Sequence, residues 1–167
     1  DIDDELVKSA LKKVPSIKNS FIDTITNQNL NIGTYDIIFM LGVHSIFDDL
    51  NWIKNINELM RNDDSVAYIF GMFNPYDIDV IIKSKDSPNG KHWEKGWNNF
   101  SKKSISFESK KNGLGCDFTD FEIGIDIPER ADDKLRTWTI NLEDNNRLII
   151  NGLGLIQNFS LCKLYKL

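Results

Sequence analysis

The first residues suited to chemistry follow an apolar run in the first third of the chain. Residues 35–41 read Tyr-Asp-Ile-Ile-Phe-Met-Leu and are followed by Gly42, Val43 and His44. A histidine just past a strand can act as a general base, because its ordinary pKa is near neutral. The alternative is a histidine that packs where a strand meets a helix. His44 and Asp48 also have the i, i+4 spacing of helical metal ligands, but no third ligand is evident, so no metal is expected.

A second group of candidate residues consists of bulky aromatic side chains. Trp93 and Trp97 lie four residues apart, and Phe100 and Trp138 follow them. Aromatic side chains supply much of the apolar area of small-molecule sites, so these four predict the wall of an acceptor pocket. The same spacing suits the hydrophobic core of a cap. The sequence leaves both alternatives open.

The elements that would position these residues are visible in the apolar pattern of the first half. The run at 35–41 predicts a central strand buried on both faces, and 65–73 predicts another buried strand. Helical spacing predicts a helix over 48–61, and a capped helix is expected between residues 3 and 15. A short strand is expected at 17–25. Alternating strands and helices favour a parallel sheet, whose ligands lie beyond the carboxyl ends of the strands.

The second half of the chain has a different character. Ser101 predicts the cap of a helix that ends at Lys111, and a short helix is expected at 76–82. Further strands are predicted over residues 118–127, 137–142, 147–150 and 161–167, with a hairpin turn at 143–146.

Composition limits the classes of function. The chain has 167 residues, which suits one domain, and a formal charge of −5, which argues against binding to nucleic acid. Two cysteines, Cys116 and Cys162, do not make a disulfide framework. No apolar run approaches the length of a membrane span, so the sequence predicts a soluble, cytoplasmic protein without a membrane partner.

Four short motifs succeed one another in the first 70 residues. They are Asp1-Ile2-Asp3, Phe21-Ile22-Asp23, Tyr35-Asp36-Ile37-Ile38 with Gly42-Val43, and Leu59-Met60-Arg61 before the strand at 66–70. In order and spacing they resemble the class I S-adenosylmethionine-dependent methyltransferases. The resemblance implies an α/β, Rossmann-like sheet, mostly parallel with antiparallel C-terminal strands. It also implies S-adenosyl-L-methionine as cofactor and methyl transfer to a small-molecule acceptor.

The resemblance assigns cofactor contacts near the start of the chain. Asp1 would accept hydrogen bonds from the ribose hydroxyls, and Ile2 would pack on the adenine ring. Asp23 would accept a hydrogen bond from the adenine amino group, with the Thr24 N–H nearby.

Further along, the resemblance places Leu41 and Gly42 close to the methionine part of the cofactor. Asn74-Pro75-Tyr76 is similar to a signature of enzymes that methylate amino groups in nucleic acids, where the aromatic residue stacks on the target base. The tripeptide follows a different strand here, and the acidic charge argues against DNA. Tyr76 is therefore kept with Trp93 and Trp97 as a candidate contact for the small-molecule acceptor.

The sequence departs from the family in one respect. The glycine-rich loop that follows the family's first strand has no counterpart before Asp1. We therefore expect a single partial domain, with cofactor-side βαβ units at 1–73 and an acceptor-side segment with C-terminal strands at 74–167. One hypothesis is a homodimer in which a second copy pairs with the 35–41 strand and completes the sheet. The alternatives are an NAD-dependent oxidoreductase, since Asp1 would suit NAD equally, and a non-catalytic subunit or interaction module.

Overall fold

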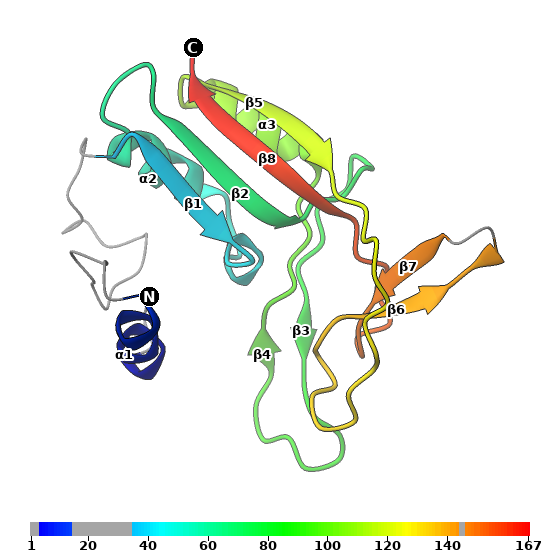
Figure 1. The fold of residues 1–167 in the computed structure, drawn as a ribbon. Helices are drawn as coiled ribbons and strands as arrows, with labels where there is room; N and C mark the ends of the chain where they lie inside the picture. Colours follow the sequence, from blue (N-terminus) through cyan, green and yellow to red (C-terminus); the bar gives the residue numbers. More distant parts are fainter. Residues whose placement is uncertain (1–3, 15–34, 144–145) are drawn as a thin grey trace.

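A four-stranded sheet forms the centre of the structure, a computed structural model that describes residues 4–14, 35–143 and 146–167 (Figure 1). The strand order is β1-β2-β8-β5. The strands span β1 (Ile37–Leu41), β2 (Val66–Met72), β8 (Phe159–Lys166) and β5 (Leu114–Asp120). The strand expected at 17–25 lies outside the described residues, as do Asp1, Ile2, Asp23 and Thr24.

Strand directions bring three strand ends to one edge of the sheet. β1 pairs with β2 in parallel, and β8 is antiparallel to both β2 and β5. β1, β2 and β5 therefore run the same way, and each ends where β8 begins. This mixed α/β sheet confirms the Rossmann-like class expected from the sequence. We call the edge formed by these three ends the carboxyl edge.

Two helices cover one face of this sheet. α2 (Asn51–Leu59) presents an apolar stripe to the strands, as its helical spacing predicts. α3 (Lys102–Lys111) begins at Ser101, whose hydroxyl accepts a hydrogen bond from the Ser104 N–H at 3.0 Å. The expected helix near the N-terminus is α1 (Asp4–Lys13). No helix in the described part of the chain is long and apolar enough to cross a membrane.

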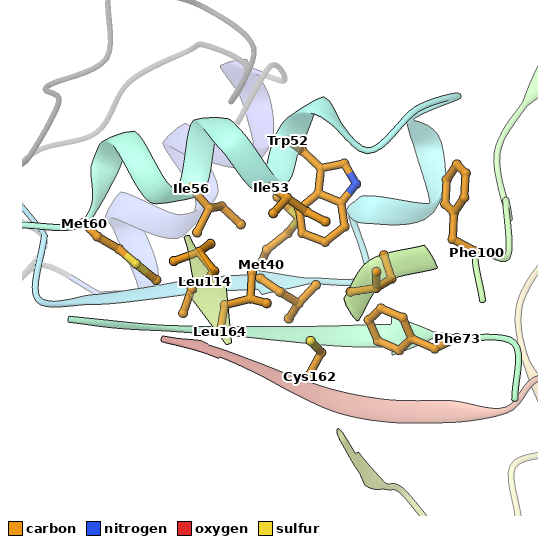
Figure 2. Packing of buried hydrophobic residues seen from close by; sticks show 13 residues of the cluster. Met40, Trp52, Ile53, Ile56, Met60, Phe73, Phe100, Leu114, Cys162 and Leu164 are labelled. Carbon is orange, nitrogen blue, oxygen red and sulfur yellow. The ribbon is translucent and has the colours of Figure 1, made fainter. Parts of the chain in front are cut away.

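The hydrophobic core lies between these helices and the sheet. Figure 2 shows Trp52, Ile53 and Ile56 pointing from α2 toward the strands that carry Met40 and Leu164. All five side chains are buried. Because burial removes apolar surface from water, this layer supplies the main driving force for folding.

The prediction that the 35–41 strand is buried on both faces is wrong. Met40 faces the helices and is buried, but Ile37, Phe39 and Leu41 on the opposite face are 57%, 66% and 61% exposed. α2 and α3 cover only the first face, and an apolar run by itself does not reveal which face is covered. β1 is also an edge strand of the described sheet.

Two long insertions leave the sheet at the carboxyl edge (Figure 1). Arm 1, residues 74–100, contains β3 (Lys83–Ser84) and β4 (Glu94–Lys95). Arm 2, residues 121–158, contains the predicted hairpin of β6 (Trp138–Asn141) and β7 (Arg147–Ile150).

Backbone hydrogen bonds hold the two ends of each arm together. The Asn74 N–H donates to the Phe100 carbonyl at 2.9 Å, and the Phe121 N–H donates to the Phe159 carbonyl at 2.9 Å. Each arm therefore returns to almost the point at which it leaves the sheet. Arm 1 then continues into α3, and arm 2 continues into β8.

The short helix predicted at 76–82 is absent. The Asn74 side chain accepts from the Tyr76 N–H at 3.1 Å and donates to the Ile78 carbonyl at 2.8 Å. Val80 then pairs with Asn99 across the arm. Such local side-chain bonds compete with helical hydrogen bonding, which explains the irregular backbone.

Candidate active site at the carboxyl edge

The end of β1 leaves space for a ligand. Leu41 is exposed at the strand end, and Gly42 adopts a left-handed backbone with φ of 74°. The Gly42 N–H donates to the Phe70 carbonyl at 2.7 Å, which fixes the turn beside β2. A Cβ added at Gly42 would meet no atom within 4 Å. The position therefore combines open space with a backbone that glycine adopts most readily.

His44 lies in the core immediately after this turn. Its side chain is fully buried, its Nε2 lies 3.0 Å from the Met72 carbonyl, and its ring stacks on Phe73 with 4.6 Å between centroids. Burial lowers the pKa of the imidazole, which favours the neutral form. Gly71 makes room for the ring, since a Cβ there would overlap Cε1 of His44 and lie 2.8 Å from its Nδ1.

The position of His44 favours the packing alternative over contact with a substrate. The role of general base stays a prediction from sequence. Asp48 gains no partner for metal binding either: the described ranges contain no group of three or more His, Cys, Asp or Glu side chains that could hold a metal ion.

Asn98 joins arm 1 to the segment that follows β1. Its buried Nδ2 donates to the Phe47 carbonyl at 2.8 Å and to Asp48 Oδ1 at 3.1 Å. Its Oδ1 accepts from the Ile82 N–H at 2.8 Å, and its own N–H donates to the Ser45 carbonyl at 2.9 Å. Asn98 thus ties two other stretches of backbone, residues 45–48 and Ile82, to its own.

An ion pair reinforces this junction from the outside. Lys95 in β4 pairs with Asp48. The pKa of the Asp48 carboxyl lies below its usual value, first because Lys95 donates a hydrogen bond to it and second because Asn98 does. The pair is exposed to solvent and contributes little to stability. Of these two links between arm 1 and the segment after β1, the buried Asn98 is therefore the stronger.

We expect Asn98→Ala to lower the free energy of unfolding by about 1–3 kcal/mol, because buried groups of Phe47 and Ile82 lose their partner. Arm 1 should also become more open to trypsin, which cuts at its lysines. Urea unfolding and timed digestion measure the two effects. Asn89→Ala, an exposed asparagine in the same arm, is the control. Equal digestion of the two variants would contradict an anchoring role for Asn98.

Trp97 lines a cavity between the two arms. Its backbone has φ of 64°, an unusual value for a bulky residue, directly after Gly96 with φ of 146°. The open cavity has a volume of about 460 Å³. Arm 2 supplies the rest of its wall: Ile127, Asp133, Leu135, Arg136 and Thr137. Strained backbone often marks functional positions, and here it brings an aromatic side chain to a cavity near the carboxyl edge.

The other predicted aromatic residues lie elsewhere. Phe100 is buried in the core, which fits the core alternative. Trp93 and Tyr76 are exposed, and Trp93 has the Lys85 ammonium 5.4 Å from its ring centroid. Trp138 is half-buried in β6. Of the three predicted acceptor contacts, Trp97 is thus the one that lines this cavity.

Sequence reasoning missed Asn98. Its hydrogen-bond partners lie 16 and about 50 residues away along the chain, so no local spacing links them. The signal would have been the Asn98-Asn99 pair between two aromatic candidates, Trp97 and Phe100, which does not distinguish Asn98 from Asn99.

Comparisons with known proteins place this arrangement in a fold. No protein-family model and no curated protein sequence matches the chain. A SAM-dependent methyltransferase from Methanosarcina mazei superposes with a TM-score of 0.60 at 12% identity, over 100% of this chain and 80% of that one. The YcgJ protein from Bacillus subtilis gives 0.59 at 10% identity, over 99% and 80%. The chain therefore has the Rossmann-like fold of the class I SAM-dependent methyltransferases.

Proposed function

We propose that this chain carries out S-adenosylmethionine-dependent methyl transfer to a small-molecule acceptor. The observation that carries the proposal is the carboxyl edge, where the open Leu41–Gly42 turn ends β1 and an open cavity lies between the two arms. Asn98, next to Trp97, is bonded to Ser45, so the cavity wall is tied to the segment just after this turn. Ligands of open α/β sheets bind at this edge.

The residues at the edge fit the cofactor. The free space over Gly42 allows close approach of a ligand to the backbone, as the methionine part would require. Asp1, Ile2, Asp23 and Thr24 would hold the ribose and adenine, as the sequence resemblance implies. When bound, S-adenosylmethionine supplies an electrophilic methyl group on its sulfonium.

The chain's own task is then to hold and align the acceptor. Positioning alone accelerates such a transfer strongly, because the two reactants no longer have to meet in solution. Ile127 and Leu135 give the Trp97 cavity apolar walls, and Thr137 adds a hydroxyl. The two charged lining residues, Asp133 and Arg136, pair with each other at 3.1 Å. This mixture suits a small organic acceptor better than a nucleic acid. Trp93 and Tyr76, both exposed on arm 1, would contact only an acceptor that extends beyond the cavity.

Calorimetric titration with S-adenosylhomocysteine tests the proposal. We expect binding to the chain, and we expect Asp1→Asn and Asp23→Asn each to weaken it by about 1–3 kcal/mol, since each removes a charged acceptor. Asp63→Asn, in an exposed turn, is the matched control and should bind as the parent chain does.

Two other results would count against methyl transfer. Binding of NAD without binding of S-adenosylhomocysteine would favour an oxidoreductase. Binding of neither would favour a non-catalytic subunit.

A further inference from the structure

A second and larger cavity lies where arm 2 meets the sheet. Its volume is about 680 Å³, and its wall combines the start of β8, the loop after β5 and strand β7. Phe121, Phe159 and Ile149 give it apolar surface, and Gln157 contributes an amide. It is separate from the Trp97 cavity, but the two share a wall, because Thr137 of the first donates a hydrogen bond to Gln157 of the second at 2.8 Å.

Gln157 carries an unused hydrogen-bond donor. The residue is only 3% exposed, and its N–H donates to the Ile149 carbonyl at 2.8 Å, which fixes its backbone. Its Oε1 accepts from Thr137, whereas the buried Nε2 has no partner among the described residues. Buried donors are nearly always bonded in native proteins. Gln157 is also one of the residues that line the cavity, so an acceptor atom on a ligand there is a candidate partner for this donor.

The aromatic side chains of the wall indicate the body of that ligand. Phe70 stacks on Phe159 with 5.4 Å between centroids and meets Phe121 edge-on at 5.2 Å. Phe121 is nevertheless 47% exposed. The cluster thus holds Phe121 in place while leaving much of its surface open, which suits the binding of another planar ring.

The charges of the wall disfavour an anionic ligand, and the unbonded Gln157 donor disfavours an ammonium group, which offers no acceptor atom. Lys102 is paired with Asp120, and Arg147 is paired with Asp126 at 2.7 Å. Both cations are therefore already balanced by carboxylates. Glu122 adds a further acidic group to the wall, which disfavours an anion.

We propose that this cavity binds a neutral aromatic molecule with an acceptor oxygen, the oxygen on Gln157 Nε2 and the ring against Phe121 and Phe159. The site does not depend on the methyl transfer proposed above. It would bind its ligand whether or not the chain binds S-adenosylhomocysteine, so the two proposals fail independently.

Nuclear magnetic resonance of the ¹⁵N-labelled chain tests the site directly, because the side-chain amide of Gln157 gives its own pair of signals. Gln157→Met removes that pair and so assigns it. Benzamide is the neutral probe with a carbonyl oxygen, and benzoate and benzylamine are its charged counterparts. We expect benzamide to shift the Gln157 signals saturably, with weaker shifts from the two charged probes.

Two variants distinguish loss of the ring contact in the cavity from a general effect of removing a phenylalanine. Phe121→Ala should weaken benzamide binding roughly fivefold or more, which corresponds to about 1 kcal/mol. Phe107→Ala removes an exposed ring from α3 and should change nothing. Gln157 signals that stay in place at saturating benzamide, or equal shifts from all three probes, would overturn the proposal. Unchanged affinity in Phe121→Ala would overturn it as well.

Discussion

Replacing Trp52 with alanine is expected to lower the free energy of unfolding by about 3–5 kcal/mol. Trp52 is the largest of the fully buried side chains, and it joins α2 to the sheet in the centre of the core (Figure 2). Its ring also lies 6.0 Å from that of His44, so the segment after β1 rests partly on it. Urea unfolding followed by circular dichroism measures the loss.

A conservative variant of Trp52 separates packing from hydrogen bonding. The Trp52 Nε1 is buried and has no partner among the described residues, so Trp52→Phe removes no hydrogen bond and should cost well under half as much. Trp93→Ala removes an exposed tryptophan and should stay within about 0.5 kcal/mol of the parent chain. An unfolding midpoint of Trp52→Ala equal to that of Trp93→Ala would contradict a central position of Trp52 in the core.

Adding one methyl group at Gly71 is expected to destabilise the chain by about 3 kcal/mol, the upper end of the usual range for overpacking. The new Cβ of Gly71→Ala would overlap the His44 ring, which cannot retreat because it stacks on Phe73 and is bonded to the Met72 carbonyl. Chemical denaturation gives the change in free energy.

A second-site change tests the cause of that loss. Adding His44→Ala to Gly71→Ala removes the clash, so the double variant should lose less stability than the sum of the two single changes. Gly124→Ala is the matched control, because a Cβ at Gly124 meets no atom within 4 Å. Additive losses in the double variant would mean that Gly71 does not serve to accommodate His44.

The sequence predicted those helices and strands that are marked by neighbouring residues, such as a helical spacing, a cap or a turn. Helical spacing from Trp52 onward gave α2, the Ser101 cap gave the start of α3, and polar residues between two apolar runs gave the β6–β7 hairpin. The burial of β1 was mispredicted, because Ile37 and Phe39 look the same in sequence whether or not a layer covers them.

The same distinction between local and distant signals applies to the residues of the candidate site. The family resemblance singled out Gly42, and aromatic spacing singled out Trp97. Gly42 lies at the end of β1 and Trp97 lines a cavity between the arms, while the ligand contacts expected of both stay predictions. Asn98 and Gln157 were not predicted. Each is a single polar residue whose importance comes from burial and from partners 16 or more residues away, and neither property appears in a local pattern.

The closed ends of the two arms have a consequence for how such a protein changes over time. One backbone hydrogen bond joins the two ends of each arm, between Asn74 and Phe100 in arm 1 and between Phe121 and Phe159 in arm 2. Each arm is therefore a loop whose ends are already joined. Doubling the length of a flexible loop raises the entropic cost of closing it by only about 0.6 kcal/mol. Lineages can lengthen, shorten or exchange an arm, and with it the lining of a cavity, while the strands and their shared edge are inherited unchanged.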